Sequence, residues 1–204
     1  MRTLVIDSAT EACSVALLDD RSLIAGDYRL LGRGHAEALV PMIAALPDKG
    51  RADRIAVALG PGSFTGVRVG LAAARALALA WQCQLVGYPT LALVAAMARA
   101  QTDEPTCTIA MTGGHGEWFV QSFGADGLAT TDLASLPPQL AASQTKNNLI
   151  AGTQAEALVG LRGEGRALPI HPDARNFGLL AAELIGPADQ PLYGRAPDAR
   201  LPVA

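Results

Sequence analysis

The stretch Gly60-Pro61-Gly62-Ser63-Phe64-Thr65-Gly66-Val67-Arg68-Val69-Gly70 decides the fold. The apolar residues 55–59 before it predict a strand, and residues 66–82, rich in Ala, Leu and Gly, predict a long helix. Glycines allow positive φ and close approach of backbones, and a hydroxyl residue can cap the helix. Because free amides at a helix N-terminus also attract anions, this is either a phosphate-binding loop or a tightly packed turn. The loop residues are Gly60, Gly62, Ser63, Thr65, Gly66 and Arg68.

The composition indicates a folded protein without a nucleic-acid-binding surface of its own. Of the 204 residues, 50% are hydrophobic and 17% charged, and the net charge is −3. The three cysteines lie far apart without CxxC spacing, which predicts neither a disulfide framework nor a zinc site. The chain begins with a strand pattern and not with a signal peptide, and its longest apolar stretch, residues 69–81, is short for a bilayer span. We therefore expect a cytoplasmic protein without membrane contact.

The order of the predicted elements divides the chain into two α/β units. The first, residues 1–102, is predicted to contain strands at 3–6, 13–18, 23–30, 55–59 and 84–87 and helices at 35–46, 66–82 and 90–100. The second, residues 103–204, is predicted to contain strands at 106–111, 117–123 and 148–151, helices at 153–161 and 176–185, and an extended tail from 186. The opening strand–turn–strand, with Asp7 at its turn, resembles the start of the actin/hexokinase/sugar-kinase superfamily. This resemblance implies a two-lobed actin/hexokinase-like (ASKHA) fold with a reduced C-terminal lobe.

Three stretches resemble the bacterial TsaB (YeaZ) family. They are residues 4–17 (LVIDSATEACSVAL), 34–41 (GHAEALVP) and 60–70 (GPGSFTGVRVG), and residues 88–93 (YPTLAL) and 191–195 (PLYGR) also fit. The resemblance is dense over residues 1–100 and thin beyond them. It implies a non-catalytic relative of TsaD, the enzyme that transfers a threonylcarbamoyl group onto adenosine 37 of tRNA. In this family context we favour the packed-turn interpretation of the glycine loop.

The same resemblance implies the partners of the protein. The N-terminal lobe would pair with a TsaD-like transferase, and the pair would recruit a TsaE-like ATPase. Without TsaD the chain would form a homodimer, and tRNA would be contacted only through the complex.

Two positions depart from the patterns of these relatives. TsaD-type enzymes carry a His-x-x-x-His metal pair where this chain reads GYPTLALV, residues 87–94, so we expect no metal. Residues 111–117 (MTGGHGE) look like the nucleotide loop of TsaD and not like the Asp-Ala-Arg-like run usual in TsaB proteins. No cofactor is expected to be required, but ATP or ADP at a subunit interface stays an open alternative. The candidate nucleotide-binding residues are Asp7, Thr10, Gly113, Gly114 and His115, with a structural role in the turn favoured for Asp7.

The helix predicted over residues 66–82 carries only two charged residues, Arg68 and Arg75, which are seven apart and therefore share a face. A helix that is apolar nearly all round has to be buried on most sides. Its cover is either the protein's own core or, in part, a partner, and we favour the partner because helix 35–46 also has an apolar stripe. The predicted interface comprises Leu39, Met42, Ile43, Val69, Leu71, Ala72, Ala73, Arg75, Ala76 and Leu79.

The favoured function is thus a non-catalytic scaffold in tRNA modification, without catalytic residues of its own. One alternative is a nucleotide-binding ATPase or phosphotransferase of the same fold, motivated by Asp7, the two glycine loops and His115. A remote alternative is a glycopeptidase-like hydrolase, for which the sequence offers neither a metal pair nor a nucleophile elbow. His35 and Glu37 are two apart and point in different directions on a helix, so we interpret them as cap or surface residues.

Overall fold

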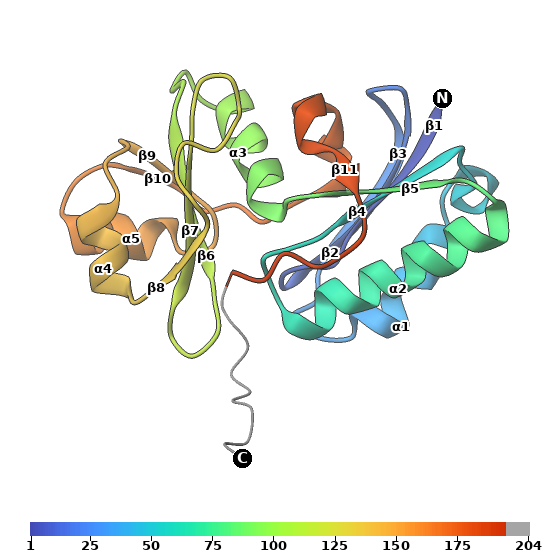
Figure 1. The fold of residues 1–204 in the computed structure, drawn as a ribbon, viewed down its shortest axis with the longest axis horizontal. Helices are drawn as coiled ribbons and strands as arrows, with labels where there is room; N and C mark the ends of the chain where they lie inside the picture. Colours follow the sequence, from blue (N-terminus) through green and yellow to red (C-terminus); the bar gives the residue numbers. More distant parts are fainter. Residues whose placement is uncertain (195–204) are drawn as a thin grey trace, which may run out of the picture.

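Six strands form the β-sheet of the first lobe in the computed structural model, which describes residues 1–194 (Figure 1). Their order is β11-β5-β4-β1-β2-β3, with β1 antiparallel to β2 and parallel to β4. The central strands are buried on both faces, which is why they read as continuous apolar runs in the sequence. The strand bounds are β1 Arg2–Asp7, β2 Ala12–Asp19, β3 Ser22–Leu30, β4 Arg54–Ala58, β5 Gln84–Tyr88 and β11 Gly186–Pro187.

The second lobe is built on a five-stranded sheet with the order β10-β9-β6-β7-β8. The hairpin of β6 and β7 is antiparallel, whereas β9 runs parallel to both β6 and β10. Helices α4 and α5 pack on this sheet through a small apolar core that includes Ala141 and Leu158. The bounds are β6 Cys107–Thr112, β7 Trp118–Phe123, β8 Ala134–Leu136, α4 Pro138–Gln144, β9 Leu149–Ala151, α5 Ala155–Arg162 and β10 Arg166–Leu168.

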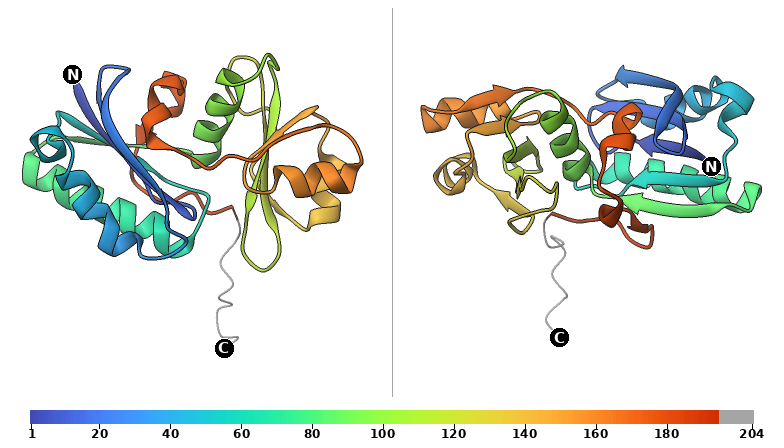
Figure 2. Two further views of the ribbon diagram at one scale, coloured as in Figure 1. Left: turned by 180° about the vertical axis from the view of Figure 1, so that it is seen from behind. Right: turned by 90° about the horizontal axis from the view of Figure 1, so that it is seen from above.

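Helices cover the first sheet on both faces. Helices α1 (His35–Ala44) and α2 (Phe64–Trp81) lie side by side on its outer face (Figure 2). Helix α3 (Thr90–Ala100) lies between the two sheets, and nine of its residues, from Thr90 to Ala98, are buried. Its apolar side chains join one core with residues of both sheets, such as Val5 of β1 and Ile109 of β6. The two lobes therefore share a core.

The first lobe matches the elements expected from the sequence, whereas the last third of the chain differs. The helix predicted over residues 176–185 is replaced by two short 3₁₀ segments, η2 (Ala174–Leu179) and η3 (Ala182–Leu184). Gly178 explains part of this difference, because glycine disfavours a helix and a Cβ here would overlap the carbonyl oxygen of Arg21. The chain then returns to the first sheet, where β11 pairs with β5. Residues 174–187 thus pack mainly on the first lobe.

The glycine loop before α2 packs against the turn between β1 and β2. A Cβ on Gly62 would overlap the carbonyl oxygen of Ala9, and a Cβ on Gly66 would overlap that of Ser8. Two hydrogen bonds fasten the same contact, from Ser63 N to Ala9 O at 2.7 Å and from Ser8 Oγ to Gly66 O at 2.8 Å. The loop glycines therefore serve close packing, which was one of the two alternatives left open by the sequence.

We predict that Gly66→Ala destabilises the protein although alanine is the better helix former. The added methyl group has to push the β1–β2 turn away, which we expect to lower the free energy of unfolding by about 1–3 kcal/mol. The matched control is Gly160→Ala in α5, where nothing lies within 4 Å of the added Cβ. The free energy of unfolding of Gly160→Ala should rise by up to about 1 kcal/mol. Urea unfolding of both variants measures the difference, and equal effects of the two substitutions would contradict the packing role.

Candidate functional site

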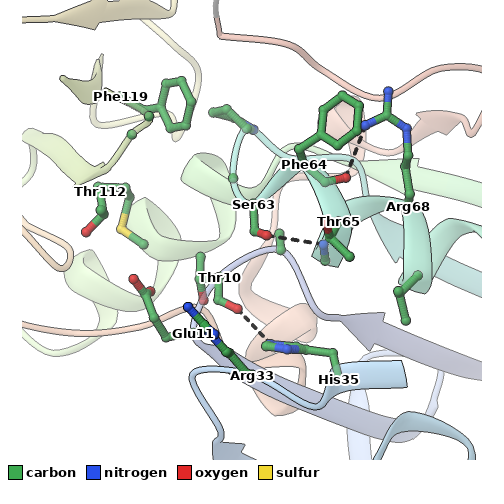
Figure 3. Close-up of a pocket in the computed structure, with 18 of the residues that line it drawn as sticks. Thr10, Glu11, Arg33, His35, Ser63, Phe64, Thr65, Arg68, Thr112 and Phe119 are labelled. Carbon is green, nitrogen blue, oxygen red and sulfur yellow. Dashed lines mark hydrogen bonds between the residues drawn. The ribbon is translucent and has the colours of Figure 1, made fainter. Parts of the chain in front are cut away.

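A cleft of about 1110 Å³ lies between the two lobes. Its first-lobe wall is formed by residues 9–11, 32–37 and 61–66, which are the β1–β2 turn and the starts of α1 and α2. Its second-lobe wall is the β6–β7 hairpin, and Figure 3 shows Thr112 and Phe119 facing Ser63 and Phe64 across the cavity. Residues 192–194 of the tail line the cleft as well.

The cleft brings together four of the five candidate nucleotide-binding residues. Thr10, Gly113, Gly114 and His115 line the cavity from opposite lobes. Asp7 does not, because its side chain is turned into the core and is 1% exposed. A direct role of Asp7 in holding a nucleotide is therefore corrected, and the structural role favoured from the sequence matches its position.

Asp7 is held by hydrogen bonds inside the first lobe. Ala9 N donates to its Oδ1 at 3.0 Å, and the hydroxyl of Tyr88 lies 3.2 Å from its Oδ2. That hydroxyl also lies 3.3 Å from the carbonyl oxygen of Ile6, so one phenolic proton faces two acceptors. A proton on Asp7 satisfies both, because the carboxyl can then donate to Tyr88 while Tyr88 donates to Ile6.

Burial raises the pKa of the Asp7 carboxyl from its ordinary value to about 7. The hydrogen bonds from Ala9 and Tyr88 act in the opposite direction, and the nearby charge of Asp173 adds a smaller increase. Burial likewise raises the pKa of Tyr88 well above its usual value. Both groups are thus adapted to a neutral, dry contact, which is unlike a carboxylate that orients a metal-bound water.

Three of the polar side chains at the cleft, those of His35, Ser63 and Thr112, make structural bonds. His35 Nε2 donates to the carbonyl oxygen of Thr10 at 2.8 Å, as Figure 3 shows. Ser63 Oγ accepts from Gly66 N at 3.2 Å and caps α2, as its position predicted. Thr112 and Thr153 bond to each other at 3.1 Å. Within residues 1–194, no cluster of three or more His, Cys, Asp and Glu that could bind a metal ion is found.

A second surface lies on the outer side of α1 and α2. We name it the α1–α2 face and define it by Val40, Ala44, Ala72, Ala76, Leu79 and Ala80, all of which are exposed. Leu79 is 82% exposed, the highest value among the large apolar side chains of residues 1–194, and Val40 is 60% exposed. Ala72, Ala76 and Leu79 of this face were predicted interface residues, and Val69 and Ala73 are half-buried beside it.

Four predicted interface residues have to be removed from that set. Leu39, Met42 and Ile43 of α1 and Leu71 of α2 are at most 4% exposed and pack in the core beneath the helices. Helical spacing correctly places the buried residues of each helix on one face. That face packs against the protein's own sheet, however, and is not open to a partner. The α1–α2 face consists of the neighbouring exposed positions instead.

Helix α2 is also long and apolar enough, by length and composition alone, to cross a membrane. The sequence-based expectation of a shorter apolar stretch counted only residues 69–81 and left out the first turn of the helix. One helix of this kind is weak evidence for a membrane span, because helices of globular proteins also meet these criteria.

The two arginines of α2 bind the C-terminal tail. Arg75 Nη2 donates to the carbonyl oxygens of Ala188 and Asp189, and Arg68 Nη2 donates to the hydroxyl of Tyr193 at 2.7 Å. The sequence pattern does not predict these contacts, since more than 110 residues separate the partners along the chain. The only signal was the resemblance of residues 191–195, of which Arg195 lies outside the described residues.

A protein-family model described as tRNA N6-adenosine threonylcarbamoyltransferase, TsaD, matches residues 29–135, just over half of the chain. The protein named TsaB of Escherichia coli is 42% identical over 100 residues, and that of Haemophilus influenzae 39% over 99 residues. The chain belongs to the TsaB (YeaZ) family. The aligned stretches cover 47% and 45% of this TsaB-family chain but only 43% and 41% of those relatives.

Solved structures extend the similarity to both lobes. YeaZ from Pseudomonas aeruginosa superposes with a TM-score of 0.79 at 28% identity, covering 94% of this TsaB-family chain and 99% of that one. EutJ from Carboxydothermus hydrogenoformans gives a TM-score of 0.51 at 13% identity over 89% of this chain and 90% of that chain, a likeness of fold alone. The chain therefore has the two-lobed actin/hexokinase-like fold implied by its opening strands.

We predict that Asp7→Asn changes how the stability of the protein depends on pH. The folded state keeps the Asp7 proton up to about pH 7, whereas the unfolded chain loses it near pH 4, so stability falls as the pH rises between these values. A shift of this size corresponds to about 4 kcal/mol. Asn has nearly the same shape and does not titrate. The free energy of unfolding of the variant should therefore rise relative to that of the parent protein between pH 4 and pH 7, and this difference should stay constant above pH 7.

Chemical unfolding at several pH values measures this difference. Asp103→Asn, at an exposed position, controls for the loss of one negative charge. Parallel stability curves for the parent protein and Asp7→Asn would show that folding does not raise the pKa of Asp7.

Proposed function

We propose that this chain acts in tRNA threonylcarbamoyladenosine biosynthesis as a non-catalytic subunit that pairs with a TsaD-like transferase through the α1–α2 face. The names of its curated relatives support the pathway. The relatives are matched over less than half of their length, so their activity is carried to this chain as part of the proposal. Recruitment of a TsaE-like ATPase and contact with tRNA through the complex are included on the resemblance alone.

The observation that carries the proposal is the exposed apolar surface of α2. Its outer side presents Ala72, Ala76 and Leu79; the two small alanines let another helix approach closely, and Leu79 adds apolar area. Val40 of α1 extends the surface beyond α2. Burying such a face against a partner removes apolar area from water, which is the main driving force of association.

Sequence similarity between the two proteins favours a TsaD-like chain as the occupant. Residues 29–135, which match the TsaD family model, contain both α1 and α2. A transferase from Erythrobacter litoralis is itself 36% identical to this chain over 94 residues, covering 42% of this chain and 27% of the enzyme. Two related faces can pack about an approximate two-fold axis, and two identical ones would give the homodimer expected without the partner.

The cleft supports a role without chemistry of its own. Asp7 is sealed beneath the β1–β2 turn, and the hydroxyl of Ser63 is used as a helix cap. Both side chains are thus already used in contacts inside the first lobe. The hydrolase alternative requires a nucleophile paired with a base, or a metal site.

We predict that Ala76→Glu abolishes pairing with the TsaD-like protein of the same organism while the isolated chain stays folded. The carboxylate would be buried without a partner, which should weaken binding by about 100-fold or more. Ala182→Glu, at an exposed position outside α1 and α2, is the matched control. Size-exclusion chromatography with light scattering measures the complex, and a complex that survives both Ala76→Glu and Ala72→Glu would overturn the proposed surface.

We also propose that this chain pairs with the TsaD-like protein without a nucleotide bound to it. We predict that ATP with magnesium leaves the thermal midpoint of the isolated chain unchanged and does not alter its binding to the partner. A thermal shift that disappears in Gly114→Val would instead favour the nucleotide-binding enzyme, since Gly114 lines the cleft and has open space around it.

A further inference from the structure

The segment after β11, residues 188–194, runs from the edge of the first sheet past the start of α2 toward the second lobe (Figure 1). It contains no regular secondary structure. Ala188 is 8% exposed and packs in the first-lobe core, so the segment begins at a fixed point. Asp189, Gln190, Leu192 and Tyr193 are exposed, so apolar burial contributes little to holding the rest.

Polar contacts with α2 hold the segment instead. Arg75 Nη2 donates to the carbonyl oxygen of Asp189 at 2.8 Å and to that of Ala188 at 3.3 Å. Near the start of α2, the guanidinium of Arg68 lies 3.2 Å from the ring centroid of Phe64 and 5.5 Å from that of Tyr193. It also donates a hydrogen bond to the Tyr193 hydroxyl. Both charged residues of α2 therefore bind this one segment.

The far end of the segment reaches both walls of the cleft. Leu192 N donates to the carbonyl oxygen of Leu59 at 2.7 Å, at the point where β4 leads into the glycine loop. Two residues later the backbone lies so close to β7 that a Cβ on Gly194 would overlap the ring of Phe119. Leu192, Tyr193 and Gly194 line the cleft between these points.

We propose that residues 188–194 form a latch across the cleft, fastened by Arg68 and Arg75, that limits how far the two lobes open. This inference does not depend on the proposed function. Every acceptor in the latch is neutral. Beyond the buried anchor at Ala188, exposed residues hold the latch through hydrogen bonds and ring contacts, so it can open without unfolding either lobe. Because the two arginines sit on α2, anything that occupies their guanidinium groups releases the latch.

The first test follows hydrogen exchange of the Leu192 amide in the isolated chain. Removing one hydrogen bond to a charged group changes an opening equilibrium by about tenfold. Because Arg75→Ala removes two such bonds, we expect exchange about tenfold faster or more in this variant and faster still in Arg68→Ala/Arg75→Ala. Arg21→Ala is the matched control, because Arg21 also donates to a backbone carbonyl at 2.8 Å, that of Leu180, but outside the latch.

The second test measures the distance between the lobes. Spin labels at Arg51→Cys and Gln139→Cys, both exposed, report on the first and second lobe in a Cys83→Ser background. We expect a longer or broader distance distribution in Arg68→Ala/Arg75→Ala and an unchanged one in Arg21→Ala. Ala76→Glu alone is included because it disturbs self-association without touching the latch, so loosening in that variant as well would assign the effect to association.

Unchanged Leu192 exchange in the double variant would overturn the proposal. Faster exchange with an unchanged interlobe distance would also overturn it, because the segment would then be attached to the lobes without restraining them.

Discussion

The close contact between the β1–β2 turn and the glycine loop is the constraint on which the first lobe depends. It requires glycine at 62 and 66, since side chains there would displace the carbonyl oxygens of Ala9 and Ser8. The contact fixes where α2 begins and therefore which of its residues face the sheet. The exposed α1–α2 face and the two tail-binding arginines both follow from that placement.

The same contact lies between the cleft and the side chain of Asp7. Asp7 ends β1 directly before the turn, but its carboxyl faces Tyr88 from the end of β5. This carboxyl is buried, its pKa is about 7, and its neutral form satisfies its neighbours, so it belongs to the interior of the lobe and not to the wall of the cleft. The cleft keeps the shape of a binding site, while Ser63 and His35 at its wall are used in a helix cap and a turn contact.

Most of the first lobe could be predicted because its strands are continuous apolar runs and its helices are long. β8, α4 and β10 were missed, since segments of three to seven residues are too short to show a period. Periodicity grouped Leu39, Met42 and Ile43 correctly on one side of α1, but it carries no information on whether a sheet or a partner covers that side. The sealing of Asp7 by Tyr88 likewise depends on a contact between residues 81 positions apart.

Helix α3 bears on how this protein can come apart. Its side chains from Thr90 to Ala98 are buried between the two sheets, so neither lobe has a complete interior of its own. Separating the lobes at the polar segment after α3 would leave one side of this helix facing water. The two halves recognised in the sequence are therefore one cooperative folding unit, which should melt in a single calorimetric transition.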